Sequence, residues 1–180
     1  MMKTEKNSPA VLVNSLRENT IAKTFIAGNG VDSLRIYISK YINPDKAFVD
    51  DVTIHLSTIV GAMDYGTILD CISLPKVKEY LDEVMPNEVS EEYKLWSVKK
   101  ISPYRKDYHF ITVGYTIRID VFRSWSSIGP PPYPFMITVR MSSKKANRKV
   151  LMQCLTNECF RDYVSRLIKK TYRPRREDLL

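Results

Sequence analysis

The sequence predicts an α+β domain in which a single antiparallel sheet packs against two to three amphipathic helices, with a flexible N-terminal arm. Between positions 111 and 121 every odd residue is apolar or aromatic, and this period-2 alternation is typical of a strand with one buried face. After a segment rich in turn-forming residues, alternation resumes at Phe135, Ile137, Val139 and Met141. Two such strands joined by a loop most simply form an antiparallel pair, which can bury one face and leave the other in water.

The length of 180 residues fits one domain. We assign residues 1–30 to a flexible N-terminal arm, 31–172 to a compact α+β domain and 173–180 to a short C-terminal tail. The arm carries apolar pieces, one of them at 21–26. Such pieces either stay disordered or dock on the same molecule or on a neighbour. The candidate self-association segment in the arm consists of Val11, Leu12, Val13 and Leu16.

The first half of the domain is expected to alternate strands and helices. Residues 34–41 alternate as a strand, and residues 50–63 have apolar positions at helical spacing after a capping aspartate. A short strand is expected at 67–74. A helix then begins at Pro75 and ends at Pro86.

The second half contains one ambiguous stretch. Residues 87–105 have no clear pattern, although 93–98 alternate weakly and could form an edge strand. Val150, Met152 and Cys154 alternate and are expected to form a further strand. Thr156 or Asn157 then caps a last helix.

The charge of the chain points to an acidic partner. The formal net charge is +8 and the isoelectric point is near 9.3, which favours nucleic acid, an anionic membrane surface or an acidic protein. A solvated basic face is the plain alternative. The candidate membrane- or nucleocapsid-binding patch consists of Arg140, Lys144, Lys145, Arg148 and Lys149, and a candidate nuclear-import signal consists of Lys169, Lys170, Arg173, Arg175 and Arg176.

The sequence contains few candidates for catalytic residues. His55 is expected to be a core or partly buried histidine, and the spacing of Asp107 and His109 at a strand start is common by chance. No phosphate-binding glycine loop occurs, and the three cysteines lack metal-ligand or disulfide spacing. We therefore expect no catalytic residue, no metal site and no cofactor. Without a signal peptide or an apolar run near the roughly 18 residues of a span, a reducing compartment and only peripheral membrane contact are expected.

One short motif remains. Pro130, Pro131, Pro132 and Tyr133 form a stiff segment with an aromatic anchor, the arrangement that WW domains recognise. The prolines could equally only shape the loop between two strands and block edge pairing.

These pieces together resemble the matrix proteins of rhabdoviruses, which are small, basic and non-enzymatic, with a mobile N-terminal arm and an α+β domain. The resemblance lies in the strand at 34–41, the expected helix at 50–63, the expected short strand before Leu74 and the strand at 111–121, together with the basic surface and the Pro-Pro-x-Tyr element. It covers about residues 30–170, by pattern and order. In well-studied members that element lies in the N-terminal arm, whereas here it lies inside the domain.

The resemblance implies a structural virion protein beneath the envelope, found in the host cytoplasm, at membranes and in the nucleus. Its partners would be other copies of itself, the viral nucleocapsid of nucleoprotein and RNA, anionic membrane lipids, the envelope glycoprotein and host WW-domain proteins. It would self-associate, condense the nucleocapsid, bridge it to the membrane and support budding. The alternative is a basic nucleic-acid-binding accessory or silencing protein, in which Tyr163 and Tyr172 beside arginines stack on single strands. An enzyme that uses Asp107 and His109 is a third reading.

Overall fold

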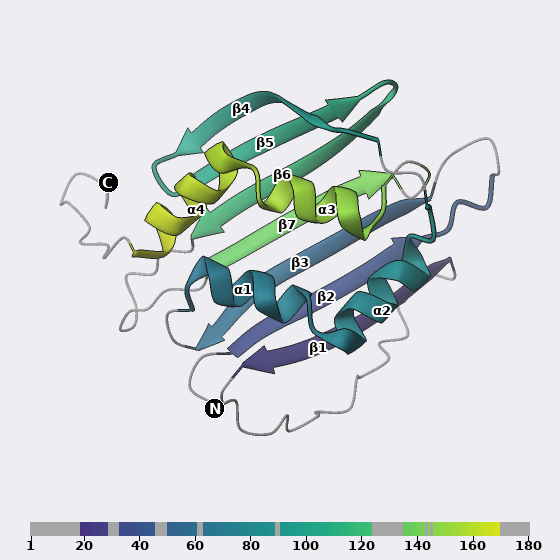
Figure 1. Ribbon diagram of the computed structural model, residues 1–180, viewed down its shortest axis with the longest axis horizontal. Helices are drawn as coiled ribbons and strands as arrows, with labels where there is room; N and C mark the ends of the chain where they lie inside the picture. Colours follow the sequence, from purple (N-terminus) through teal and green to yellow (C-terminus); the bar gives the residue numbers. More distant parts are fainter. Residues whose placement is uncertain are drawn as a thin grey trace.

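A seven-stranded antiparallel sheet and four helices form the part of the chain that this computed structural model describes, residues 19–28, 33–45, 50–60, 63–88, 91–123, 135–142, 144 and 146–169 (Figure 1). The strands are β1 (Thr20–Gly28), β2 (Ser33–Tyr41), β3 (Asp51–Val60), β4 (Lys94–Ser102), β5 (Arg105–Thr112), β6 (Tyr115–Arg123) and β7 (Phe135–Ser142). The helices are α1 (Tyr65–Ile72), α2 (Pro75–Val84), α3 (Arg148–Leu155) and α4 (Glu158–Lys169). The α+β class with a single antiparallel sheet is confirmed, with four helices in place of two to three.

The strand order is β1-β2-β3-β7-β6-β5-β4, and every neighbouring pair is antiparallel. Two meanders, β1 to β3 and β4 to β7, therefore meet where β3 pairs with β7 at the centre of the sheet. This arrangement puts β1 and β4 at the two opposite edges (Figure 1). The predicted antiparallel pair is confirmed as β6 and β7, in which Ile119 lies opposite Val139.

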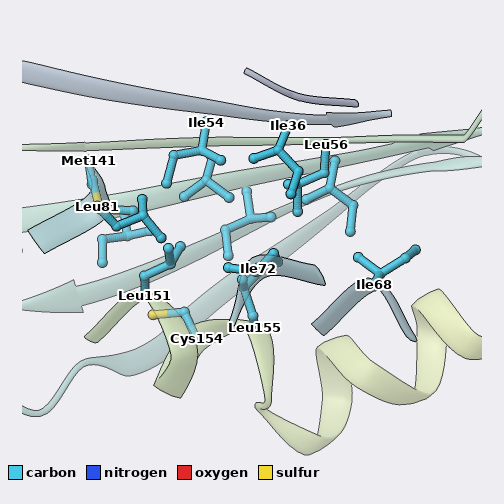
Figure 2. Close-up of a cluster of buried hydrophobic side chains, with 14 of the residues drawn as sticks. Ile36, Ile54, Leu56, Ile68, Ile72, Leu81, Met141, Leu151, Cys154 and Leu155 are labelled. Carbon is cyan, nitrogen blue, oxygen red and sulfur yellow. The ribbon is translucent and has the colours of Figure 1, made fainter. Parts of the chain in front are cut away.

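All four helices lie on one face of the sheet (Figure 1). The core fills the space between them, with Ile36, Ile54 and Leu56 from the strands facing Ile72 and Leu155 from the helices (Figure 2). These side chains are almost completely buried, and each contributes on the order of 1.5–3 kcal/mol of burial free energy. The opposite face of the sheet, which we call the outer face, is not covered by any of the four helices and carries mostly polar side chains.

The alternating run around 111–121 belongs to two strands instead of one. It turns at Val113 and Gly114, and Thr112 pairs with Tyr115 across the turn. Gly114 adopts a φ of 78°, which a residue without a Cβ reaches at little cost. The two-residue turn reverses the parity of the buried positions, which are even in β5 (Tyr108 and Phe110) and odd in β6 (Ile117 and Ile119). The odd residue Ile111 therefore faces away from the core, opposite Thr116, and the alternation read from the sequence did not follow a single buried face.

The helix expected at 50–63 is wrong, because Asp51–Val60 form β3. Val52, Ile54 and Leu56 alternate as buried residues facing the helices. The helical prediction joined Val52 and Leu56 to the apolar residues near position 60 and left Ile54 out. Pairing with β2 on one side and β7 on the other decides the outcome, since a central strand satisfies its backbone groups on both edges.

Two strands were also expected where helices form. Residues 67–74 lie largely in α1, and the Asp64 carboxylate accepts a hydrogen bond from the Thr67 amide at 2.9 Å. Val150 to Cys154 lie in α3, where Asn147 caps the Val150 amide at 2.9 Å. These side-chain caps favour the helix start, and packing of one apolar stripe on the sheet selects the helix over the strand.

The other expected elements are confirmed. The strand at 34–41 is β2, the helix that begins at Pro75 is α2, and the tentative edge strand lies in β4. Asn157 precedes the last helix, and its Oδ1 accepts from the Phe160 amide at 3.3 Å. Within the described residues no helix is long and apolar enough to cross a membrane.

The assignment of residues 1–30 to an arm is wrong for its last third, because Thr20–Gly28 form β1 and pair with β2 along their whole length. Lys23, Phe25 and Ala27 lie on the core side of this edge strand. Phe25 packs against Tyr80 of α2 with ring centroids 6.0 Å apart. The apolar piece at 21–26 therefore docks on its own molecule.

Candidate interaction surfaces

The structure divides the predicted basic patch between two places. Arg140 is exposed on the outer face of β7, where it lies opposite Arg118 of β6. Arg148 lies at the start of α3, on the helix side, and its Nε is 2.9 Å from an Asp82 oxygen of α2. Lys144 and Lys149 are exposed. Arg148 is therefore partly neutralised, and Arg140 does not share a face with the α3 residues.

Several predicted site residues lie outside the described residues. They are Lys145 of the basic patch, Lys170, Arg173, Arg175 and Arg176 of the import signal, the whole Pro130, Pro131, Pro132 and Tyr133 motif, and Val11, Leu12, Val13 and Leu16 of the arm. Lys169 is the last residue of α4. These interpretations stay predictions.

The outer face carries an ion-pair network on β5 and β6. The Arg105 guanidinium holds Asp120 with two contacts, Nε to Oδ1 at 3.1 Å and Nη2 to Oδ2 at 3.0 Å. Asp107 lies opposite Asp120 in the register and 4.0 Å from the Arg118 guanidinium. Burial, together with the hydrogen bond and charge of Asp120, raises the pKa of Asp107. Two arginines and two aspartates largely balance one another here, so this part of the face is not a free cationic site.

The two histidines do not form a catalytic pair with their neighbours. The Nδ1 of His55 lies 3.0 Å from the hydroxyl of Thr138, and its ring packs against Tyr37 at 5.9 Å. Burial, followed by the charge of Arg140, lowers the pKa of His55. In the described part of the chain no hydrogen bond joins His109 to Asp107, although both side chains lie on the outer face of β5. His55 is half-buried, as expected, but it belongs to strand β3 and not to a helix, and its side chain lies on the outer face.

The cysteines and the acidic side chains of the described residues do not assemble into a metal site. Cys71 and Cys154 are buried, and Cys159 is exposed on α4. Burial raises the pKa of Cys154 to about 12, which leaves that thiol protonated and unreactive at neutral pH. Within the described ranges, no three His, Cys, Asp or Glu side chains lie close enough together to hold a metal ion.

The edge strand β4 carries a candidate binding surface that we did not predict from the sequence. Lys94, Lys99 and Lys100 are all exposed, and no acidic residue occurs between positions 93 and 106. Trp96 is 71% exposed, Ile101 46% and Val98 40%. The signal that could have found this surface was the run of lysines around one tryptophan, in a segment with only weak alternation.

The pairing of β4 with β5 is irregular at two places, next to exposed apolar residues, whereas Val98 lies in register opposite Tyr108. The register of β4 against β5 shifts between Leu95 and Ser97 and again between Lys100 and Ser102. Trp96 and Ile101 are the residues left without a partner at these two shifts. Bulges of this kind twist a strand and leave the extra residue out of the ladder.

The cationic character continues onto β5. Lys100 lies directly opposite Lys106 in the register, a like-charge pair that disfavours strand pairing. The Lys106 ammonium lies 4.2 Å from the centroid of the Tyr163 ring on α4, a cation–π contact that offsets part of this cost. We call Lys94, Trp96, Val98, Lys99, Lys100 and Ile101 the β4 edge surface.

No family model, no curated protein and no solved structure matches this chain.

Proposed function

We propose that this protein is a viral matrix protein, a structural component of an enveloped virion. In this role it self-associates, condenses the nucleocapsid and bridges it to the inner face of the envelope membrane. The observation that carries the proposal is the presence of two separate exposed cationic regions on one small body. One is the β4 edge surface, and the other consists of Lys144 and Lys149, where the chain passes from β7 to α3.

A bridging protein needs two binding regions that two partners can occupy together. In the sheet order, β6 and β5 separate β7 from β4. Three strand spacings of about 4.8 Å put the two regions roughly 14 Å apart along the sheet. Both partners named in the proposal, a phospholipid leaflet and a nucleoprotein–RNA complex, are polyanions. Cationic side chains gain free energy on both by releasing counterions or by attraction to the negative surface.

The observed secondary structure removes part of the resemblance to rhabdovirus matrix proteins. The strand at 34–41 is present, whereas the expected helix at 50–63 is a strand and the expected strand before Leu74 is a helix. The proposal therefore depends on the net charge of +8 and on the two cationic regions. The absence of an assembled catalytic group in the described residues is compatible with it and carries no weight.

The test combines vesicle sedimentation with light scattering. The full-length protein is mixed with phosphatidylcholine vesicles with and without phosphatidylserine at several salt concentrations, and the soluble fraction is examined for concentration-dependent assembly. We expect salt-sensitive binding to the anionic vesicles and growth of oligomers. A variant with Lys144, Lys145, Arg148 and Lys149 changed to Ala is expected to bind vesicles or nucleoprotein–RNA more weakly. A monodisperse monomer that ignores anionic vesicles would refute the proposal.

A nucleic-acid-binding accessory protein is the second candidate. The exposed Trp96 indole between lysines favours it, because an aromatic ring can stack on an unpaired base while lysines contact phosphates. Fluorescence anisotropy with labelled single-stranded RNA separates the candidates. Tight RNA binding with a steep salt dependence, together with no vesicle binding, would favour this second function.

A further inference from the structure

The β4 edge surface combines apolar and cationic side chains in a way that folding does not explain. A tryptophan side chain offers 150–250 Å² for burial, and Trp96 leaves most of its surface in water although the buried core begins at the neighbouring Leu95. Val98 and Ile101 extend this apolar surface along the same strand. Exposed apolar groups that cluster and are flanked by charges indicate a contact surface.

The two register shifts argue against an added strand as the occupant. A second copy or an extended peptide that paired with β4 would need a regular row of backbone donors and acceptors. The shifts at Trp96 and Ile101 interrupt that row twice within nine residues, and edge bulges with lysines are devices that oppose such pairing. The occupant is therefore a surface and not a strand.

The charge of this edge selects an anionic surface. Lys94 and Lys99 flank the free edge of β4 from the outer-face side, and Lys100 flanks it from the helix side, opposite Lys106. The acid opposite Lys99 is Asp107, which also lies 4.0 Å from the Arg118 guanidinium, so the edge keeps a positive balance. A lysine close to an anionic leaflet raises membrane affinity about fivefold. Tryptophan is enriched at the headgroup level of membranes, where its ring is apolar and its N–H still finds water.

We propose that the β4 edge surface docks the protein on an anionic lipid bilayer. Trp96 and Ile101 enter the headgroup region, and the three lysines contact the lipid phosphates and carboxylates. This inference rests on the proposed function, since it names the surface through which the membrane contact is made. Single-stranded RNA fits less well, because the aliphatic Val98 and Ile101 offer no ring on which a base can stack.

Tryptophan fluorescence tests the site directly. The chain has two tryptophans, Trp96 and Trp125, so a Trp125→Phe background leaves Trp96 as the only indole. Circular dichroism and thermal unfolding first establish that this background folds like the wild type. With phosphatidylserine vesicles we expect a blue shift of the emission, and with brominated lipids we expect quenching. Neither change is expected with vesicles of phosphatidylcholine alone.

Matched variants test the charge and the ring. Lys99→Gln with Lys100→Gln is expected to weaken binding to phosphatidylserine vesicles by about 30-fold at low salt. The control is Lys76→Gln with Lys78→Gln, which removes the same charge from α2 near the opposite edge of the sheet (Figure 1) and is expected to change binding less than threefold. Trp96→Ala is expected to weaken binding at high salt.

The control for Trp96→Ala is Val113→Ala, which trims another apolar side chain, 88% exposed, at the turn between β5 and β6. This control is expected to bind like the wild type.

The outcomes separate this inference from the proposed function. If the wild type binds anionic vesicles but Trp96 emission and the Lys99/Lys100 variant are unaffected, the β4 site is wrong and the matrix function stands. If the wild type ignores anionic vesicles, both fail. If Trp96 responds to single-stranded RNA but not to vesicles, the edge is a nucleic-acid site and the inference is overturned.

Discussion

Replacement of Arg123 by Met should cost about 3 kcal/mol of unfolding free energy, because this arginine caps a helix from inside the protein. It is the last residue of β6 and only 8% exposed. Its Nη1 donates to the carbonyl oxygens of Leu167 at 2.6 Å and Ile168 at 2.7 Å, in the last turn of α4. Both carbonyls belong to the last residues of α4, a place where helix carbonyls lack intrahelical partners and are satisfied by side chains, and the C-terminal end of the helix dipole attracts a cation.

The magnitude follows from opposing contributions. A hydrogen bond to a charged group contributes about 1.5–3 kcal/mol, and favourable dipole geometry adds up to about 2 kcal/mol. Burial of the guanidinium opposes them: it lowers the pKa of Arg123, and its Nε lacks a hydrogen-bond partner in the described part of the structure. The balance leaves roughly 3 kcal/mol, which for a chain of this size corresponds to a fall in Tm of about 6–12 °C.

Urea unfolding followed by circular dichroism measures this change. The control is Arg118→Met on the same strand, where the side chain is 58% exposed on the outer face and pairs loosely with Asp107 at 4.0 Å. We expect the control to change stability by less than about 1 kcal/mol. If Arg123→Met and Arg118→Met lose equal stability, or if Arg123→Met loses less than about 1 kcal/mol, the capping argument is wrong.

Three further predictions concern the helix layer and the sheet. Asn147→Ala should cost about 2 kcal/mol in urea unfolding, because Asn147 caps α3 and also donates to a carbonyl after α2; an unchanged midpoint would contradict this. Burial lowers the pKa of His55 below 6.5, so stability is full above pH 6.5 and falls as the pH drops through that value towards the lowered one. The variant His55→Asn should flatten this pH dependence, and an identical slope in both proteins would exclude the explanation. With a thiol reagent, one cysteine per folded chain should react quickly: Cys159 is exposed, whereas Cys71 and Cys154 are buried and should react only on unfolding.

The elements that the sequence predicted correctly share a local cause. In β2, Leu34, Ile36 and Ile38 alternate with polar residues over one short run, and the same pattern appears in β7. Pro75 marks the start of α2 because proline lacks an amide hydrogen that the first turn does not need. In each case the neighbouring residues alone carry the information, whatever the rest of the chain does.

The errors have non-local causes. Residues 51–60 become a strand because β2 and β7 flank them on both sides, and β7 comes from more than 70 positions later in the chain. Residues 65–72 and 148–155 form helices because a helix buries their apolar side chains against one face of the sheet. Short apolar segments are compatible with either state, and tertiary packing decides between them.

The features of the candidate surfaces likewise depend partly on the sequence and partly on the tertiary structure. The sequence by itself determined the net charge of +8, the fold class and the presence of three lysines around Trp96. Only the tertiary structure decided that β4 lies at the edge of the sheet, that its register shifts at Trp96 and Ile101, and that Arg140 and Arg148 lie on different faces. The physical reason is that composition and periodicity are local properties, whereas exposure depends on which distant strands and helices cover a segment.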